Sequence, residues 1–265
     1  MGITSIKTEA KATLRGNWIS AIITTLMALI SFLIIQNIGW VLSLVIGEIA
    51  ASLIALFLTV LLCGPLTLGV FRYFWRMHGR MNEAPASAFY YFSSAVAYRK
   101  AIRLCFILAI RLLGFAFLYF LPAIAIYVIS SQELYDFLQI SIPIWSQHLA
   151  YLVNFFSTIG TVLTVITFLR FYLAPILVIA DDQMDAEEAI HMSAVIARAS
   201  VLDFIFLAFS LILWIILSFL FIPLIFTLPY FVMCYVLHAL HSIKEYNEKI
   251  KKLNDESFPS FVAGI

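Results

Sequence analysis

Between Asn17 and Phe71 the chain carries only one charged side chain, that of Glu48. A soluble core does not accept so long a run of apolar residues, whereas a helix that crosses the roughly 30 Å hydrocarbon layer needs about 20 of them. The run therefore holds two crossings, and the pattern recurs twice further along the chain. This predicts an all-α fold, a polytopic helical bundle in a membrane.

The composition assigns nearly the whole chain to that bundle. Hydrophobic residues make up 63% of the sequence and charged residues 12%, where soluble domains carry about a quarter charged residues. We expect one integral membrane domain over residues 1–243, followed by a cytoplasmic helical extension and tail over 244–265. The net charge of +1 says little about partners, because the charges are unevenly placed along the chain, and nucleic acid is not expected as a partner.

Hydropathy predicts six transmembrane helices, at residues 17–38, 48–73, 102–128, 149–173, 203–221 and 224–242. Lys and Arg gather before the first span, around the loop after the second, and behind the last. The connections at residues 36–47, 130–148 and 221–223 contain neither residue. The positive-inside rule then places both termini and the two long loops, which follow the second and the fourth span, in the cytoplasm.

The chain shows signs of a threefold repeat. A short amphipathic stretch precedes each odd span, at residues 4–16, 84–98 and 185–199, and each even span contains a proline. These prolines are Pro65, Pro175 and Pro229, and each is expected to kink its helix because proline removes a backbone hydrogen bond. The pattern favours three units of interfacial helix plus transmembrane hairpin, although prolines are frequent in membrane helices in general.

The third amphipathic stretch has the residues of a helix start. Asp185 is suited to an N-cap, and Glu187 and Glu188 follow where the helix dipole favours negative charge. The stretch is expected to lie on the membrane surface or to pack under the bundle. A calcium site is disfavoured, because the acidic residues lack the alternation and central glycine of a calcium loop.

Arg111 and Arg170 are the candidate ligand-binding residues, because ionisable groups inside a bilayer are costly and often functional. Facing the interior, they would bind an anionic lipid headgroup or substrate through bidentate contacts. The alternative is that they extend to the cytoplasmic interface or pair with Asp203. His238 and His241 lie three apart without an evident third ligand, so no metal and no cofactor are expected.

Several short motifs together resemble a bacterial family of six-helix membrane proteins known as domain of unknown function 975. The matching motifs, in chain order, are Leu14-Arg15-Gly16-Asn17-Trp18, Gly64-Pro65-Leu66-Thr67-Leu68-Gly69, Leu173-Ala174-Pro175 with Ala180-Asp181, Glu188-Ala189 with Ser193, Trp214, and Pro229-Tyr230. The part from Leu173 to Trp214 is also similar to the membrane domain attached to some glycerophosphodiester phosphodiesterases, which is an anchor and not their catalytic part. The resemblance implies a location in the bacterial cytoplasmic membrane and supplies no catalytic residue.

No enzyme activity is predicted, since the chain has no nucleophile-elbow pattern and no glycine-rich phosphate loop. The expected role is that of a membrane scaffold that contacts membrane lipids and, as a further partner, another membrane protein or a second copy of itself. The rival role is a small transporter or channel for an anionic solute or lipid. A cavity lined by both Arg111 and Arg170 would favour transport, and a tightly packed centre would favour the scaffold.

Overall fold

The computed structural model describes residues 2–81, 83–131, 146–181, 183–218 and 222–257, and these are helical with short connections and no strand. Six stretches in them are long and apolar enough to cross a membrane, which confirms the predicted fold class. The α-helices are α1 (Ile3–Leu14), α2 (Trp18–Ile46), α3 (Glu48–Leu58), α4 (Gly64–His78), α5 (Ala95–Ser130), α7 (Ser146–Arg170), α8 (Ala174–Ala180), α9 (Ala186–Ser218) and α10 (Ile222–Ser257). Residues 132–145 of the predicted loop at 130–148 and Phe221 of the predicted loop at 221–223 lie outside the described residues.

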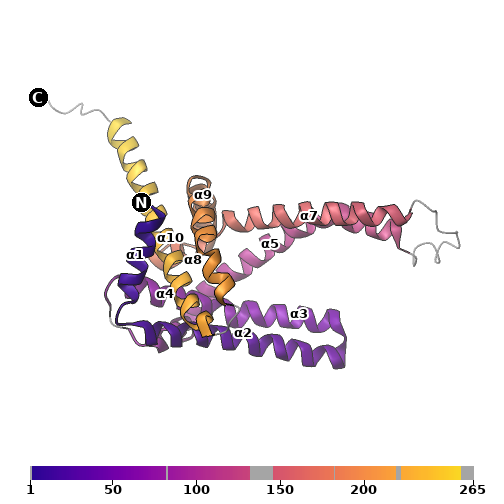
Figure 1. Ribbon diagram of the computed structural model, residues 1–265, viewed down its shortest axis with the longest axis horizontal. Coiled ribbons are helices and arrows are strands. Elements are labelled where there is room, and N and C mark those ends of the chain that lie inside the picture. Colours follow the sequence, from indigo (N-terminus) through magenta and orange to yellow (C-terminus); the bar gives the residue numbers. More distant parts are fainter. Residues whose placement is uncertain (1, 82, 132–145, 182, 219–221, 258–265) are drawn as a thin grey trace, which may run out of the picture.

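The long helices pack as three hairpins. Helix α2 contacts α3, α5 contacts α7, and α9 contacts α10. Figure 1 shows the α2–α3 and α5–α7 hairpins extending in the same general direction from a common base, where α1, α4, α8 and α10 gather. Helix α10 contacts α1, α2, α4, α8 and α9, so it links the elements at this base.

The buried core lies at the base and not along the hairpins. Its largest fully buried side chains include Leu14, Phe74, Ile190 and Met233, which come from four different helices, and Leu173, which lies in the connection between α7 and α8. Towards the tip of the first hairpin the apolar side chains are exposed, for example Leu44 at 71%, Val45 at 80% and Ile49 at 82%. Such surfaces are stable only against lipid or another apolar surface, as expected for membrane-spanning helices.

The first hairpin is longer than the sequence predicted. Helix α2 continues through the expected loop at residues 36–47 and turns at Gly47, whose φ of +86° is a conformation that favours glycine. The Asn37 amide donates a 2.8 Å hydrogen bond to the Leu33 carbonyl, which keeps this polar residue within the helix. Hydropathy placed the end of the first span at residue 38, next to Asn37, and that boundary was wrong because α2 continues to Ile46.

The prolines of the even spans occupy two different settings. Pro65 lies in the first turn of α4, directly after a π-helical turn at Thr59–Cys63. Pro175 lies in the first turn of α8, which follows a break in the helix at residues 171–173. Helix α10 runs without interruption through Pro229. The helix is therefore irregular next to the first two prolines, and a kink at Pro229 stays a prediction.

The three amphipathic stretches also differ in form. The first is the separate helix α1, and the second contains a 3₁₀ helix, η2 (Pro85–Phe92), before α5 begins. The third is not a separate helix, because α9 runs from Ala186 to Ser218 without a break and contains residues 203–218 of the predicted fifth span. Ile190 and Ala197 of this stretch are almost fully buried. The stretch therefore packs under the bundle, the second of the two expected placements, and no helix-breaking residue separates it from the span.

The predicted helical extension beyond the last span is confirmed, since α10 continues to Ser257. Lys249 Nζ lies 2.7 Å from a Glu245 carboxylate oxygen, an ion pair at i,i+4 spacing. Glu248 Oε1 lies 4.0 Å from the Nζ atom of Lys244, four residues earlier in the same helix. These exposed pairs stabilise the helix only slightly.

Candidate functional site

The two arginines singled out in the sequence lie apart from the cavities described below. Arg111 is half-buried on α5, and Arg170 is exposed at the end of α7. Neither lines the two polar pockets or the apolar cavity of the described structure. Asp203, the carboxylate expected as their partner, lines a groove with His238 instead. The structure thus does not bring the predicted site residues together around one cavity.

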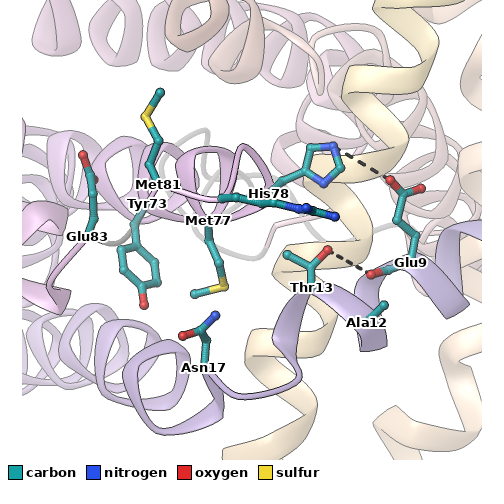
Figure 2. A pocket seen from close by; sticks show the side chains of 10 residues that line it. Glu9, Ala12, Thr13, Asn17, Tyr73, Met77, His78, Met81 and Glu83 are labelled. Carbon is teal, nitrogen blue, oxygen red and sulfur yellow. Dashed lines mark hydrogen bonds and ion pairs between the residues drawn. The ribbon is translucent and has the colours of Figure 1, made fainter.

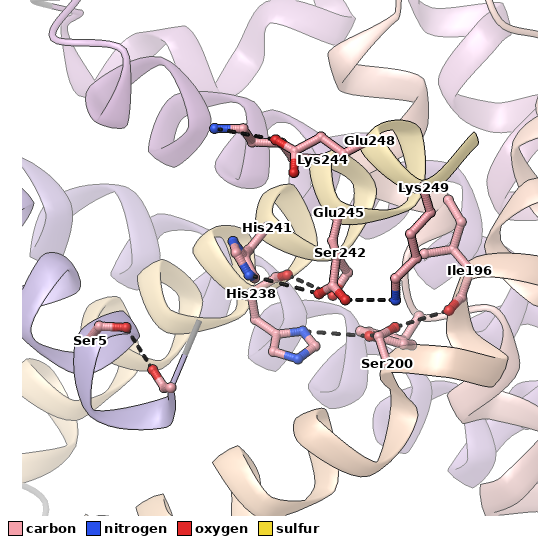
Figure 3. Close-up of polar contacts among 12 residues, drawn as sticks. Ser5, Ile196, Ser200, His238, His241, Ser242, Lys244, Glu245, Glu248 and Lys249 are labelled. Atoms are coloured by element: carbon pink, nitrogen blue, oxygen red, sulfur yellow. Dashed lines mark hydrogen bonds and ion pairs between the residues drawn. The ribbon is translucent and has the colours of Figure 1, made fainter. Parts of the chain in front are cut away.

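The polar groove between α9 and α10, called here the α9–α10 groove, has a volume of about 290 Å³. Figure 3 shows His238, His241, Ser242 and Glu245 following one another along α10, with Ser200 of α9 close to His238. The start of α1 forms a further wall. The complete lining is Gly2, Ile3, Ile6, Ile196, Ala199, Ser200, Asp203, His238, His241, Ser242, Glu245, Tyr246 and Lys249.

A buried hydrogen-bonded network forms one wall of the α9–α10 groove. The hydroxyl of Tyr172 lies 3.0 Å from Ser200 Oγ and 3.5 Å from His238 Nδ1. Ser200 Oγ donates to the Ile196 carbonyl at 3.2 Å, so Tyr172 is the donor to Ser200 and His238 Nδ1–H is placed to donate to Tyr172. All three side chains are at least nine-tenths buried. The network joins helices from the second and third hairpins at the base.

Four rings form a partition beside this network. Tyr172 stacks on Phe204 with their centroids 4.5 Å apart, and His238 lies 5.6 Å from Phe204. Tyr235 lies 6.2 Å from Phe204, and its hydroxyl donates to the Tyr172 carbonyl. Contacts at these separations suit aromatic packing. We call Tyr172, Phe204, Tyr235 and His238 the aromatic partition.

An apolar cavity of about 570 Å³ lies on the other side of the aromatic partition. Tyr172, Phe204 and Tyr235 line this cavity, whereas His238 lines the α9–α10 groove. The other lining residues are Thr67, Phe71, Leu108, Leu112, Phe168, Phe171, Pro175, Leu207, Ala208, Leu211, Phe231, Val232 and Cys234. Helices of the second and third hairpins contribute together with α4, which continues the second span of the first hairpin, so this central cavity is shared by the whole bundle.

A second polar pocket, of about 410 Å³, lies between α1 and the end of α4. Figure 2 shows Glu9 on α1 opposite His78 on α4, with His78 Nε2 3.8 Å from Glu9 Oε1. Glu83 also lines the pocket and forms an ion pair with Arg76, and Arg80 is a further lining residue. Acidic and basic side chains therefore both surround the pocket, which presents no concentrated field of one sign.

Basic residues at the start of α5 bind the acidic connection between α8 and α9, which contains Asp181 and Asp185. Arg103 donates to an Asp185 carboxylate oxygen at 2.9 Å, and Lys100 Nζ donates to the Asp181 carbonyl at 3.2 Å. Asp185 thus engages α5, while its backbone carbonyl accepts the first hydrogen bond of α9 from Ala189 at 2.9 Å. The acidic cluster therefore contributes to the contact between the second and third hairpins.

The sequence indicated some of these residues and missed others. His238 drew attention as a possible metal ligand, and the structure places it instead against Tyr172 and the aromatic partition. Tyr172 and Ser200 were not singled out, because nothing in an apolar sequence distinguishes a hydroxyl that meets a partner 28 or 66 residues away. The adjoining Leu173-Ala174-Pro175 motif was the nearest available signal.

Taken together, the fold and its pockets define the class of an all-helical, multi-pass membrane protein. No protein-family model, no curated protein and no solved structure matches the chain.

Proposed function

We propose that the protein is a non-catalytic scaffold of the bacterial cytoplasmic membrane, which contacts lipids and a further membrane protein or a second copy of itself. The observation that carries this proposal is the separation of a packed base from exposed apolar hairpins. Of the 36 residues of α5, three are buried, namely Ala101, Leu104 and Ala123. The remainder of this helix offers a long apolar surface to the surrounding membrane.

The charge distribution supports the proposed orientation. Arg72, Lys100 and Arg103 lie at the base of the hairpins, as does the lysine-rich end of α10, whereas the first hairpin turn holds no basic residue. We propose that the base faces the cytoplasm, with both termini on that side. The likeness to the six-helix bacterial family, proposed from the sequence motifs, supports the same location.

A transport role is the second candidate, and the aromatic partition is the observation in its favour. It lies between an apolar cavity, lined by Tyr172, Phe204 and Tyr235, and the polar α9–α10 groove, lined by His238. Such an arrangement suits an amphiphile better than an anionic solute, since neither Arg111 nor Arg170 lines either space. The scaffold accounts for the packed base without requiring a conducting path.

Native mass spectrometry of the protein released from lipid nanodiscs tests this choice. The variants are Arg111→Ala and Arg170→Ala, with Arg198→Ala, an exposed residue of α9, as the matched control. The scaffold predicts the same set of bound lipids and partners in all three variants and the wild type. The scaffold role would be contradicted if the wild type and Arg198→Ala retained an anionic solute that Arg111→Ala or Arg170→Ala lost.

A further inference from the structure

The central cavity has the size and position of a ligand site. Its volume of about 570 Å³ lies within the roughly 300–1,000 Å³ of pockets that bind small molecules. It is lined by α4, α5, α7, α8, α9 and α10, all within or adjoining the membrane-spanning stretches. A molecule bound there would touch all three hairpins at once.

The polar groups of the lining are directed away from the cavity by their own hydrogen bonds. Thr67 Oγ1 donates to the Cys63 carbonyl at 2.7 Å within its own helix. The Tyr235 hydroxyl donates to the Tyr172 carbonyl, and the Tyr172 hydroxyl meets Ser200 and His238. Water needs two to four polar partners to be stable in a cavity. The cavity therefore offers hydrocarbon contacts and suits neither water nor a hydrated solute.

One wall of the cavity reaches the lipid-facing surface. Phe168 of α7 lines it and is 56% exposed, and Ala208 of α9 is a second exposed lining residue, while Leu207 and Leu211 are each 2% exposed. The aromatic partition closes the cavity towards the α9–α10 groove. The apolar molecules that surround a membrane-spanning helix are lipid chains, so a chain is the occupant available on the open side.

We propose that one acyl chain of a membrane lipid inserts past Phe168 into this cavity and ends against the aromatic partition. This proposal rests on the proposed function, because it gives the scaffold a specific lipid-binding cavity in addition to the lipid contacts of its outer surface. The bound chain stabilises the contact between the hairpins by replacing empty space with dispersion contacts.

Two variants fill the cavity from different helices and test the proposal. Ala208→Trp places an indole from α9, and Leu112→Trp places one from α5. Ala125→Trp is the control, since Ala125 is exposed on α5 and lines none of the pockets described above. Each variant is released from phospholipid nanodiscs, and the bound lipid is identified by native mass spectrometry after a detergent wash that removes loosely held lipid. Size-exclusion chromatography of the same samples checks folding.

The expected result is one tightly retained acyl-chain molecule in the wild type and in Ala125→Trp, lost in both filling variants that still elute as folded protein. The mass of that molecule distinguishes a phospholipid from a free fatty acid, and either one supports the site. Equal retention in all four proteins would overturn it, as would a wild type that retains none. Failure here leaves the scaffold intact, because the scaffold is tested separately by the arginine variants.

Discussion

Replacing Ser193 with alanine is expected to lower the free energy of unfolding by about 1–3 kcal/mol, the usual cost of leaving a buried polar group without a partner. Ser193 is fully buried on α9, and it joins the two sides of the break between α7 and α8. Its hydroxyl accepts a hydrogen bond from the Leu173 backbone N–H at 3.1 Å and donates to the Arg170 carbonyl at 3.0 Å. Because Ser193 is fully buried, bulk water does not reach the site to replace its hydroxyl.

Thermal unfolding in detergent, followed by the loss of the monodisperse chromatographic peak, measures the effect. Ser31→Ala is the matched control, because the Ser31 hydroxyl donates only to the Met27 carbonyl one turn back in the same helix. We expect a clearly lower melting temperature for Ser193→Ala and little change for Ser31→Ala. Equal melting temperatures for the two variants would show that Ser193 does not hold the break.

Gly69→Ala is expected to destabilise the protein by about 2 kcal/mol or more, the cost of overpacking a site that cannot yield easily. Gly69 lies on α4 where η2 crosses it, and a methyl group there would overlap the Ala88 carbonyl. Because the obstacle is backbone, the whole 3₁₀ helix must shift. The loss has to exceed the gain of about 1 kcal/mol that alanine normally brings to a helix interior.

Gly114→Ala provides the control for the same chemical change. Gly114 lies within α5, and a methyl group there would meet nothing within 4 Å. We therefore expect an unchanged or slightly raised melting temperature for Gly114→Ala and a lowered one for Gly69→Ala. If both glycines tolerate alanine equally, η2 does not pack against α4 as closely as described.

The sequence predicted the all-helical fold and its six membrane-spanning stretches, because hydropathy over 20 residues is a local property. It misplaced the end of α2, since Asn37 is polar yet bonded within the helix. It also separated residues 185–199 from the fifth span, although nothing in the chain breaks α9 there. The local sequence left two placements open for this stretch, on the membrane surface or under the bundle, and the burial of Ile190 and Ala197 is decided by tertiary packing.

The site was less accessible to sequence reasoning than the fold. Arg111 and Arg170 were selected because charged residues are rare within the spans, but the sequence does not show whether such a side chain faces a cavity. The central cavity and the aromatic partition are built from Phe, Tyr and Leu, the residues that occur throughout the spans. Their meeting depends on the break before Pro175 and on how the hairpins cross, which no local pattern encodes.

We propose that the packed base of the hairpins faces the cytoplasm, and cysteine accessibility in whole cells is a direct test of this orientation. Single cysteines replace Ser131, just beyond α5, or Ser93, an exposed residue at the end of η2, in a protein lacking Cys63, Cys105 and Cys234. We predict that a membrane-impermeant maleimide labels Ser131→Cys in intact cells and Ser93→Cys only after permeabilisation. The reverse pattern would contradict the orientation and, with it, the cytoplasmic placement of the base.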